Sequence, residues 1–331
     1  MPSQQVRTRV WRNGIPDDAG APLERLGDVV GRPDTLVWVD LCGPDEAMLR
    51  RVADELGLDP HAVEDALTED ERPKVSHSPS QLFLTTTAIW CATADSTLVA
   101  TRVSAFALPG ALITVRLDDR FDMAAVEQRW DENADLLKFG ERALLHGLLD
   151  DIVDGYFAVV EILDDGIEAI EDLLFAEDTE DPNALQRRTF ALRKSLAQAR
   201  RTILPMREVV NSVLRRATDG ADGSNAELLP YFEDINDHML RAADWVDSLR
   251  DMVSSVIDTN MSLADTRMNL IMKKLTSWAA IVAVPTAVTG YFGQNVPFPG
   301  AGSAPGFWAS LVLMVVLAVI LYVIFRAKDW L

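Results

Sequence analysis

The sequence has very little cysteine and none of the motifs on which nucleotide-driven or hydrolytic chemistry depends. Its two cysteines, Cys42 and Cys91, have neither CxxC spacing nor an obvious partner motif, a pattern typical of reduced thiols in a cytosolic domain. The chain contains no GxxxxGK[ST], no GxGxxG after a strand, no HExxH and no GxSxG. We therefore expect neither an enzyme nor an ATP-driven pump.

Export and metal-site signals are also missing. The opening MPSQQVRTRV has no apolar h-region, so no signal peptide is expected and the N-terminal part is predicted to stay cytoplasmic. The four histidines have no paired metal-ligand spacing. We interpret them as structural or surface residues: His61, His77, His146 and His238.

Charged residues are absent from the long stretch 275–325, although the whole chain carries a formal net charge of -20. Nearly the whole acidic surplus therefore lies before Leu275. An acidic soluble part argues against nucleic acid as a partner, because phosphates would repel it. Such a surface suits a protein that collects cations.

Two apolar stretches lie within and around this uncharged region, at residues 275–292 and 307–325. At about 1.5 Å per residue each is just long enough to cross a hydrocarbon core of about 30 Å. The first also carries small and hydroxyl residues, which in a span mark close helix packing or a surface that meets water. We expect a two-span hairpin in the cell membrane.

Basic residues flank the outer ends of the predicted hairpin. Lys273 and Lys274 precede the first span, Arg326 and Lys328 follow the second, and the loop at 293–306 has no charge. Since cytoplasmic flanks carry the excess of Lys and Arg, both termini are predicted to be cytoplasmic. The paired lysines are interpreted first as anchors to lipid headgroups.

The part before the spans begins with mixed strand and helix signals and then becomes helical. Strand-like runs at 35–41, 81–90, 97–108 and 111–116 predict a sheet with helices packed against it. After Glu141 an apolar stripe with an acidic opposite face predicts one long helix, and a basic helix at 183–217 is expected to pair with it through polar faces. The linker 217–225 is followed by a pattern that predicts one helix from near Tyr231 to Phe292.

We therefore predict an α/β cytoplasmic domain, long helices and a two-helix transmembrane hairpin. The expected divisions are an α/β domain at 1–140, an acidic and basic helical pair at 141–224, a stalk helix at 225–274, a pore-lining first span at 275–292, an external loop at 293–306, a second span at 307–325 and a basic tail at 326–331.

One hairpin cannot enclose an aqueous path, so transport would require several copies of the chain. The first span and the residues before it present one helical face with spacings of three and four. That face is the candidate pore lining, and it equally suits packing against neighbouring copies: Asn269, Met272, Leu275, Ala279, Ala283, Thr286 and Gly290.

An ordered set of segments carries a family resemblance. It comprises HAVEDALTEDERPKV (61–75), PMREVV (205–210), YFEDINDHM (231–239), LRDMVSSVIDTN (249–260), NLIMKKLT and PTAVTGYFGQN within 269–295, and the closing KDWL. Together these segments resemble the CorA family of two-span, GxN-type divalent-cation channels. The resemblance covers the chain from about Trp38 to its end.

The resemblance implies a homopentamer with a funnel-shaped cytoplasmic domain, whose pore is lined by the first span and carries Mg²⁺, with cobalt as a further ion. Gly293, Gln294 and Asn295 would form the selectivity filter, with Asn295 as the ring at the outer mouth. Asp65 of one subunit and Asp258 of the next would hold a regulatory Mg²⁺ that favours the closed state. No organic cofactor is implied.

Two departures from the family pattern leave alternatives open. Gln294 stands where the usual motif has Met, and the external loop has no acidic residue. One alternative is therefore a zinc, cobalt or nickel transporter of the ZntB-like branch. Another is a membrane-anchored cation sensor that conducts nothing. The number of subunits is implied by the resemblance alone.

Overall fold

The computed structural model describes residues 5–17, 20–69, 71–78, 80–92, 98–175, 182–219, 226–294 and 299–331. These residues fall into two compact units, Met1–Ser254 and Ser255–Leu331. The long helix α7 (Leu229–Phe292) contributes to both units.

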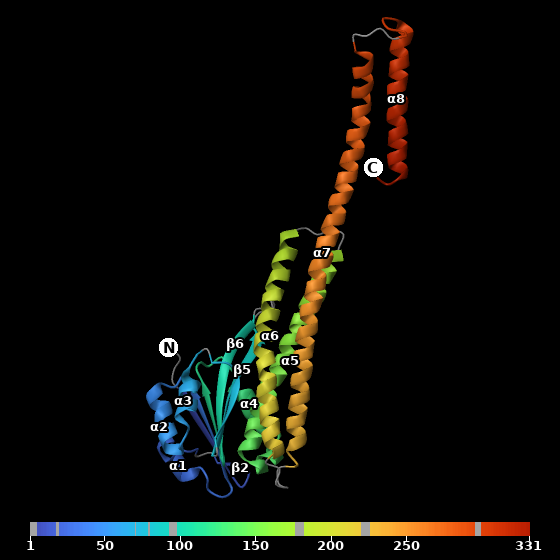
Figure 1. Ribbon diagram of the computed structural model, residues 1–331. Coiled ribbons are helices and arrows are strands. Elements are labelled where there is room, and N and C mark those ends of the chain that lie inside the picture. The colour runs from blue at the N-terminus through green and yellow to red at the C-terminus, as the bar shows by residue number, and fades with distance from the viewer. Residues whose placement is uncertain are drawn as a thin grey trace. The chain divides into compact units, whose positions relative to one another are not determined.

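The first unit contains a seven-stranded sheet with the strand order β2-β1-β3-β7-β6-β5-β4 (Figure 1). Neighbouring strands are antiparallel except β3 and β7, which run parallel from Val37 opposite Ala111 to Cys42 opposite Arg116. The strands are β1 (Gln5–Arg12), β2 (Ile15–Asp17), β3 (Thr35–Cys42), β4 (Lys74–Ser78), β5 (Gln81–Cys91), β6 (Leu98–Leu108) and β7 (Ala111–Arg116). The predicted α/β architecture is confirmed, and each of the four predicted strand runs is a strand.

Short helices cover one face of the sheet. They are α1 (Leu26–Val29), α2 (Glu46–Leu56) and α3 (Pro60–Leu67). Apolar side chains of these helices share one core with inward-facing residues of the central strands. The core includes Leu49 of α2 and Val63 of α3, together with Val39 of β3 and Ile113 of β7. Asp45 caps α2 by accepting a hydrogen bond from the Met48 amide at 2.7 Å, and Asp59 caps α3 through the His61 amide at 2.8 Å.

One short helix and two long helices cover the other face (Figure 1). They are α4 (Met123–Glu132), α5 (Glu141–Phe175) and α6 (Pro182–Asp219). Trp130 of α4 packs edge-on against Trp38 of β3, with ring centroids 5.0 Å apart. The buried Tyr156 hydroxyl of α5 donates to the Thr87 carbonyl of β5 at 2.6 Å. The long helical segment is therefore fixed to the sheet by its N-terminal half.

Helices α5 and α6 lie side by side as expected, whereas the polar pairing expected between their charged faces stays a prediction. Apolar stripes pack between the two helices and include Leu163 and Ile167 on α5 and Leu192 and Leu196 on α6. Burying these stripes contributes more than exposed ion pairs do, so the charged faces turn outward. Of the predicted linker, residues 220–225 lie outside the described residues.

Helix α7 has 64 residues and a length of about 96 Å. Its N-terminal part belongs to the first unit, where residues such as Ile235, Met239, Val246 and Leu249 are buried. The single long helix predicted up to Phe292 is confirmed, and it continues through Pro285. In the second unit, α8 (Ala304–Ala327) runs back alongside the C-terminal part of α7 (Figure 1).

Candidate functional site

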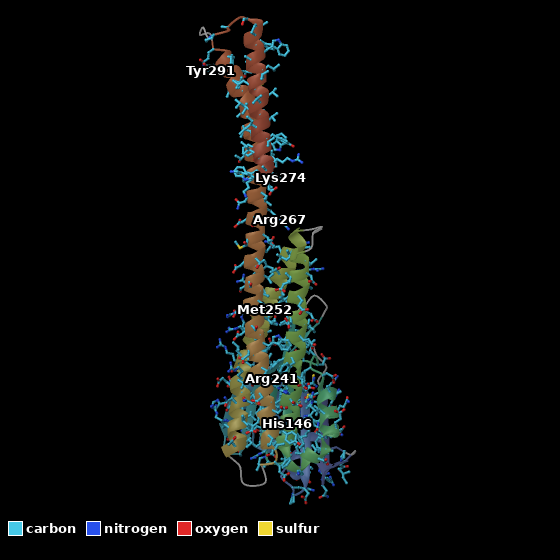
Figure 2. All side chains as sticks on the ribbon, turned by 90° about the vertical axis from the view of Figure 1, so that its right-hand side faces the viewer. His146, Arg241, Met252, Arg267, Lys274 and Tyr291 are labelled. Atoms are coloured by element: carbon cyan, nitrogen blue, oxygen red, sulfur yellow. The ribbon has the colours of Figure 1, made fainter. Side chains whose placement is uncertain are left out.

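The hairpin of the second unit is the first part of the candidate site. Both α7 and α8 contain segments long and apolar enough to cross a membrane. Lys274 and Tyr291 lie toward the two ends of the part of α7 that accompanies α8 (Figure 2). One stripe of α7 is covered in the hairpin: Ser277 is 0% exposed and Val288 is 7% exposed.

The predicted lining face lies on the other side of α7. At about 100° per residue, six of its residues point about 130° or more away from the stripe that contains Ser277 and Val288, and Asn269 points about 90° away. All seven are exposed in the single chain, with Leu275 at 63%. Other side chains of the hairpin are also exposed, among them the bulky Trp278 and Val282. What distinguishes the predicted face is the small or hydroxyl-bearing character of Ala279, Ala283, Thr286 and Gly290.

Hydroxyl groups on this part of α7 are tied to the helix backbone. The Thr286 hydroxyl donates to the Val282 carbonyl at 3.4 Å, and Thr289 donates to the Pro285 carbonyl at 2.8 Å. A hydroxyl whose proton is engaged in this way still has oxygen lone pairs that can accept hydrogen bonds. Thr286 can therefore offer an acceptor to the water shell of a cation.

The end of α7 shows why the predicted filter begins with a glycine. The Gly293 amide donates to the Thr289 carbonyl at 2.8 Å, and a side chain at 293 would place its Cβ only 2.8 Å from that same oxygen. Close backbone approach, rather than a left-handed backbone, is thus what requires glycine here. Gln294 is exposed directly after it. The predicted ring residue Asn295 lies outside the described residues.

The predicted regulatory carboxylate Asp65 has an intrachain partner. Its Oδ2 lies 2.8 Å from the Lys74 ammonium, which also contacts Glu71 Oε1 at 2.9 Å. Burial lowers the pKa of Lys74, but the hydrogen bonds to Asp65 and Glu71 outweigh it and raise that pKa overall. The ammonium is therefore charged at neutral pH and occupies part of the space around the Asp65 carboxylate.

The second predicted regulatory residue, Asp258, is exposed on α7. It belongs to the second unit, whereas Asp65 belongs to the first. Among the residues described, no three His, Cys, Asp or Glu side chains gather closely enough to hold a metal ion. A divalent cation on Asp65 would thus need donors from water or from another copy of the chain.

An arginine of α4 forms ion pairs with an acidic face of α5. Arg129 of α4 forms ion pairs with Asp150 and with Asp154, the latter at 2.8 Å, and lies 3.7 Å from Asp151. Burial, opposed by Arg129 and reinforced by the neighbouring carboxylates, raises the pKa of Asp151 to about 6. Burial also lowers the pKa of the nearby His146.

Two of these functional contacts were missed from the sequence. Lys74 stands nine residues after Asp65 in the segment ERPKV, and only the fold brings the β4 strand back to helix α3. Arg129 lies more than twenty residues before its partners, so no local spacing indicates the pairing.

Comparison with known proteins identifies what the chain resembles. The family described as CorA-like Mg²⁺ transporter protein matches residues 33–327. The cobalt/magnesium transport protein CorA of Thermotoga maritima is 31% identical over 303 residues, which are 90% of this chain and 84% of that protein. The putative metal ion transporter YfjQ of Bacillus subtilis is 31% identical over 311 residues, covering 93% of each.

A solved structure supports the fold over the whole length. The complete structure of the CorA magnesium transporter from Methanocaldococcus jannaschii matches with a TM-score of 0.76 and 24% identity, covering 99% of both chains. At this level of identity the match concerns the arrangement of the sheet, the long helices and the C-terminal hairpin.

Proposed function

The chain belongs to the CorA family of divalent-cation transporters, and on that premise we propose that it is a magnesium channel through which the ion enters the cell passively. Its place in this family makes it a membrane transporter rather than an enzyme. The proposed channel is a homopentamer that carries no organic cofactor, with the residues before the first span on the cytoplasmic side.

The observation that carries the proposal is the two-sidedness of α7. One stripe, with Ser277 and Val288, is covered within the hairpin, while the opposite face with its small and hydroxyl side chains is left open. A single hairpin encloses nothing, so this face would line a path only when several copies assemble around one axis. The face that we propose as the lining comprises Asn269, Met272, Leu275, Ala279, Ala283, Thr286 and Gly290.

The proposed filter is the Gly293-Gln294-Asn295 segment at the external end of α7. Magnesium gives up its water reluctantly and usually keeps several water ligands when bound. A ring of neutral amide oxygens can accept hydrogen bonds from these waters without stripping them, whereas a carboxylate ring would hold the ion and slow its release. An Asn295 ring therefore suits a hydrated ion that must pass quickly.

The membrane potential would drive the influx. Moving one charge through 100 mV is worth about 2.3 kcal/mol, and a divalent ion gains about twice that amount. Lys273 and Lys274 before the first span and Arg326 and Lys328 after the second favour cytoplasmic termini. An inside-negative potential would then pull the cation from the external loop toward the cytoplasmic part.

We further propose that cytosolic Mg²⁺ closes the channel by binding between Asp65 of one subunit and Asp258 of the next. Carboxylate oxygens are ligands that Mg²⁺ prefers, and both side chains reach solvent in the single chain. A bound divalent ion would offset the repulsion between the acidic surfaces of neighbouring subunits. Loss of the ion at low cytosolic Mg²⁺ would release the contact and favour the open state.

Flux into proteoliposomes under an inside-negative potential tests this function. Wild type is expected to take up Mg²⁺, Asn295→Ala to lose most of that uptake, and Asn260→Ala, which removes an exposed amide elsewhere on α7, to retain it. Uptake of zinc without magnesium would assign the chain to zinc transport. The acid-free external loop and Gln294 are the two departures from the family pattern that leave this alternative open. Absence of flux for either ion would contradict a channel and favour a non-conducting sensor.

A further inference from the structure

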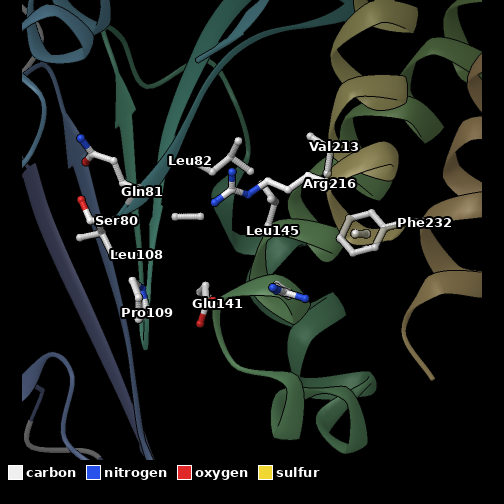
Figure 3. Close-up of a pocket in the computed structure, with 13 residues that line it drawn as sticks. Ser80, Gln81, Leu82, Leu108, Pro109, Glu141, Leu145, Val213, Arg216 and Phe232 are labelled. Carbon is white, nitrogen blue, oxygen red and sulfur yellow. The ribbon is translucent and has the colours of Figure 1, made fainter. Parts of the chain in front are cut away.

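A small cavity in the first unit is lined by two arginines from different helices. It has a volume of about 160 Å³ and lies where the ends of β5 and β6 meet the first turns of α5, the last turns of α6 and the beginning of α7 (Figure 3). Arg142 comes from α5 and Arg216 from α6, and Figure 3 shows the Arg216 side chain reaching across the pocket toward Leu82.

The guanidinium of Arg142 is incompletely satisfied. Its Nη1 atom is buried and has no hydrogen-bond partner among the residues that the structure describes. A buried charged donor without a partner costs free energy, since water no longer solvates it and no acceptor replaces the water. An acceptor that enters the cavity would recover that free energy.

Two other guanidinium groups of the same unit, those of the buried Arg116 and the half-buried Arg129, are paired with carboxylates. Arg116 donates to Asp40 through Nε at 3.1 Å and through Nη2 at 2.5 Å, and its Nη1 donates to the Phe121 carbonyl at 3.0 Å. Arg129 is likewise neutralised by carboxylates of α5. Arg142 differs from these two arginines, because it has no carboxylate partner among the described residues.

One carboxylate lines the cavity without pairing with either arginine. Glu141 lines the cavity, but its Oε2 accepts a hydrogen bond from the Gly110 amide at 3.0 Å. Gly110 has a φ of +78°, so Glu141 stabilises the tight turn between β6 and β7. Among the described side chains, Glu141 forms no ion pair with Arg142 or Arg216.

Arg216 also contacts a histidine outside the lining of the cavity. Arg216 Nη1 lies 3.5 Å from His77 Nδ1, a long contact with an exposed side chain. Burial, together with the charges of Arg216 and Arg215, lowers the pKa of His77, which is therefore neutral at pH 7. In a chain with a net charge of -20, such a cationic cavity contrasts with the overall surface.

We propose that this cavity binds a small phosphate-type oxyanion, held between the guanidinium groups of Arg142 and Arg216. Guanidinium groups recognise phosphate oxygens with directed, charge-assisted hydrogen bonds. The volume is far above the roughly 10–15 Å³ that one water needs and below the roughly 300 Å³ at which pockets for drug-sized molecules begin. It therefore suits orthophosphate or a small phosphate monoester.

Gln81 is not part of the proposed site, although it contributes to the cavity wall. Its carboxamide points away from Arg216 (Figure 3). The ligand would instead connect α5 with α6 beside the beginning of α7, so its binding would stabilise the packing of these helices. This site is separate from the proposed ion path, and its test does not depend on transport.

The test measures binding of inorganic phosphate to the full-length protein in detergent micelles at constant ionic strength. Equilibrium dialysis gives the amount of bound phosphate, and the thermal unfolding midpoint gives the stabilisation. Wild type is expected to bind one phosphate per chain and to unfold at a higher temperature as phosphate is added. Arg142→Gln and Arg216→Gln should each weaken binding about tenfold or more. Arg215→Gln, which removes the same charge one residue away, should bind as wild type does.

A parallel titration with glycerol 3-phosphate distinguishes the possible sources of the ligand. Binding of this monoester would extend the site to phosphate headgroups, and selective binding of orthophosphate would restrict it to the free ion; both outcomes support the site. Absence of phosphate and monoester binding by wild type, or equal loss of binding in the Arg215→Gln variant, would overturn it. Dialysis still tests the site in a variant with a low unfolding temperature, because only protein that elutes from a size-exclusion column at the wild-type volume is dialysed.

Discussion

The Lys74 ammonium lies between two carboxylates, 2.8 Å from Asp65 and 2.9 Å from Glu71. Asp65 is the carboxylate that we propose for the regulatory cation, so a positive charge of the same chain already stands beside it. A divalent ion on Asp65 would have to displace this ammonium or share the carboxylate with it. Lys74 is therefore expected to oppose metal binding.

Replacing Lys74 by methionine should strengthen regulatory cation binding. The ion pair is partly exposed, with side-chain exposures of 34% and 27%, so its contribution is at most about 1 kcal/mol. The Mg²⁺ concentration that half-protects the full-length protein against limited proteolysis should then fall by roughly two- to fivefold. Arg72→Met, which removes a neighbouring exposed charge, is the control and should leave that concentration unchanged. A higher half-protecting Mg²⁺ concentration for Lys74→Met would contradict competition between the Lys74 ammonium and the cation for Asp65.

Asp151 should make stability depend on pH. Its pKa is raised to about 6 by burial, so between about pH 4 and pH 6 the folded protein binds more protons than the unfolded chain. Stability contributed at this site is therefore greatest at low pH and is lost as the pH rises through 6. The shift of the Asp151 pKa from its ordinary value to about 6 corresponds to at most about 3 kcal/mol of folding free energy.

Asp151→Asn removes that ionisation and should unfold at a higher temperature than wild type at pH 7.5, by about 3 °C or more. At pH 4.5 the gain should be smaller. His146 titrates in both proteins, so comparing them at each pH largely cancels its contribution. Asp150→Asn serves as the opposite case, because it removes a direct partner of Arg129 and should lower the midpoint at pH 7.5. An equal effect of Asp151→Asn at both pH values would refute the raised pKa.

The buried pair of Arg116 and Asp40 should be essential to the sheet. Both side chains are almost fully buried, at 4% and 1% exposure, and Thr114 adds a hydrogen bond of 2.7 Å to Asp40. Arg116→Met would leave the Asp40 carboxylate buried without its counter-ion, which typically costs about 3–5 kcal/mol. Arg120→Met breaks an exposed pair with Asp118 and should cost less than about 1 kcal/mol. Thermal unfolding monitored by circular dichroism compares the two, and similar midpoints would contradict the difference.

Much of the fold follows from local sequence patterns, and the exceptions have identifiable causes. The strands β3, β5, β6 and β7 are runs rich in apolar and β-branched residues, which is why they were predicted. β1 was missed because its Arg7 and Arg9 read as a polar segment, whereas they pair with Glu127 and Asp131 of α4. Those partners are more than a hundred residues away in the chain.

The hairpin between β1 and β2 carried a usable local signal. Asn13 and Gly14 both have positive φ, at 52° and 75°, and the Asn-Gly pair is the typical sequence of a tight hairpin turn. The candidate lining face could be predicted, since it needs only helical spacing. The Lys74 contact at Asp65 could not, because it depends on how β4 lies beside α3.

The most direct test of the account is a comparison of the two faces of α7 in a flux assay. In a background with Cys42 and Cys91 replaced by alanine, Ala283→Cys places a thiol on the proposed lining. Val288→Cys places one on the face covered in the hairpin, and Val315→Cys places one on the exposed surface of α8. Magnesium uptake into proteoliposomes is measured before and after a charged, water-soluble thiol reagent.

The reagent should block uptake through Ala283→Cys and leave uptake through Val288→Cys and Val315→Cys nearly unchanged. A position that lines a water-filled path is open to a charged reagent, whereas a packed or lipid-facing thiol is not. Block at Val288 or Val315 with unaltered flux at Ala283 would contradict the proposed lining of the pore by this face of α7.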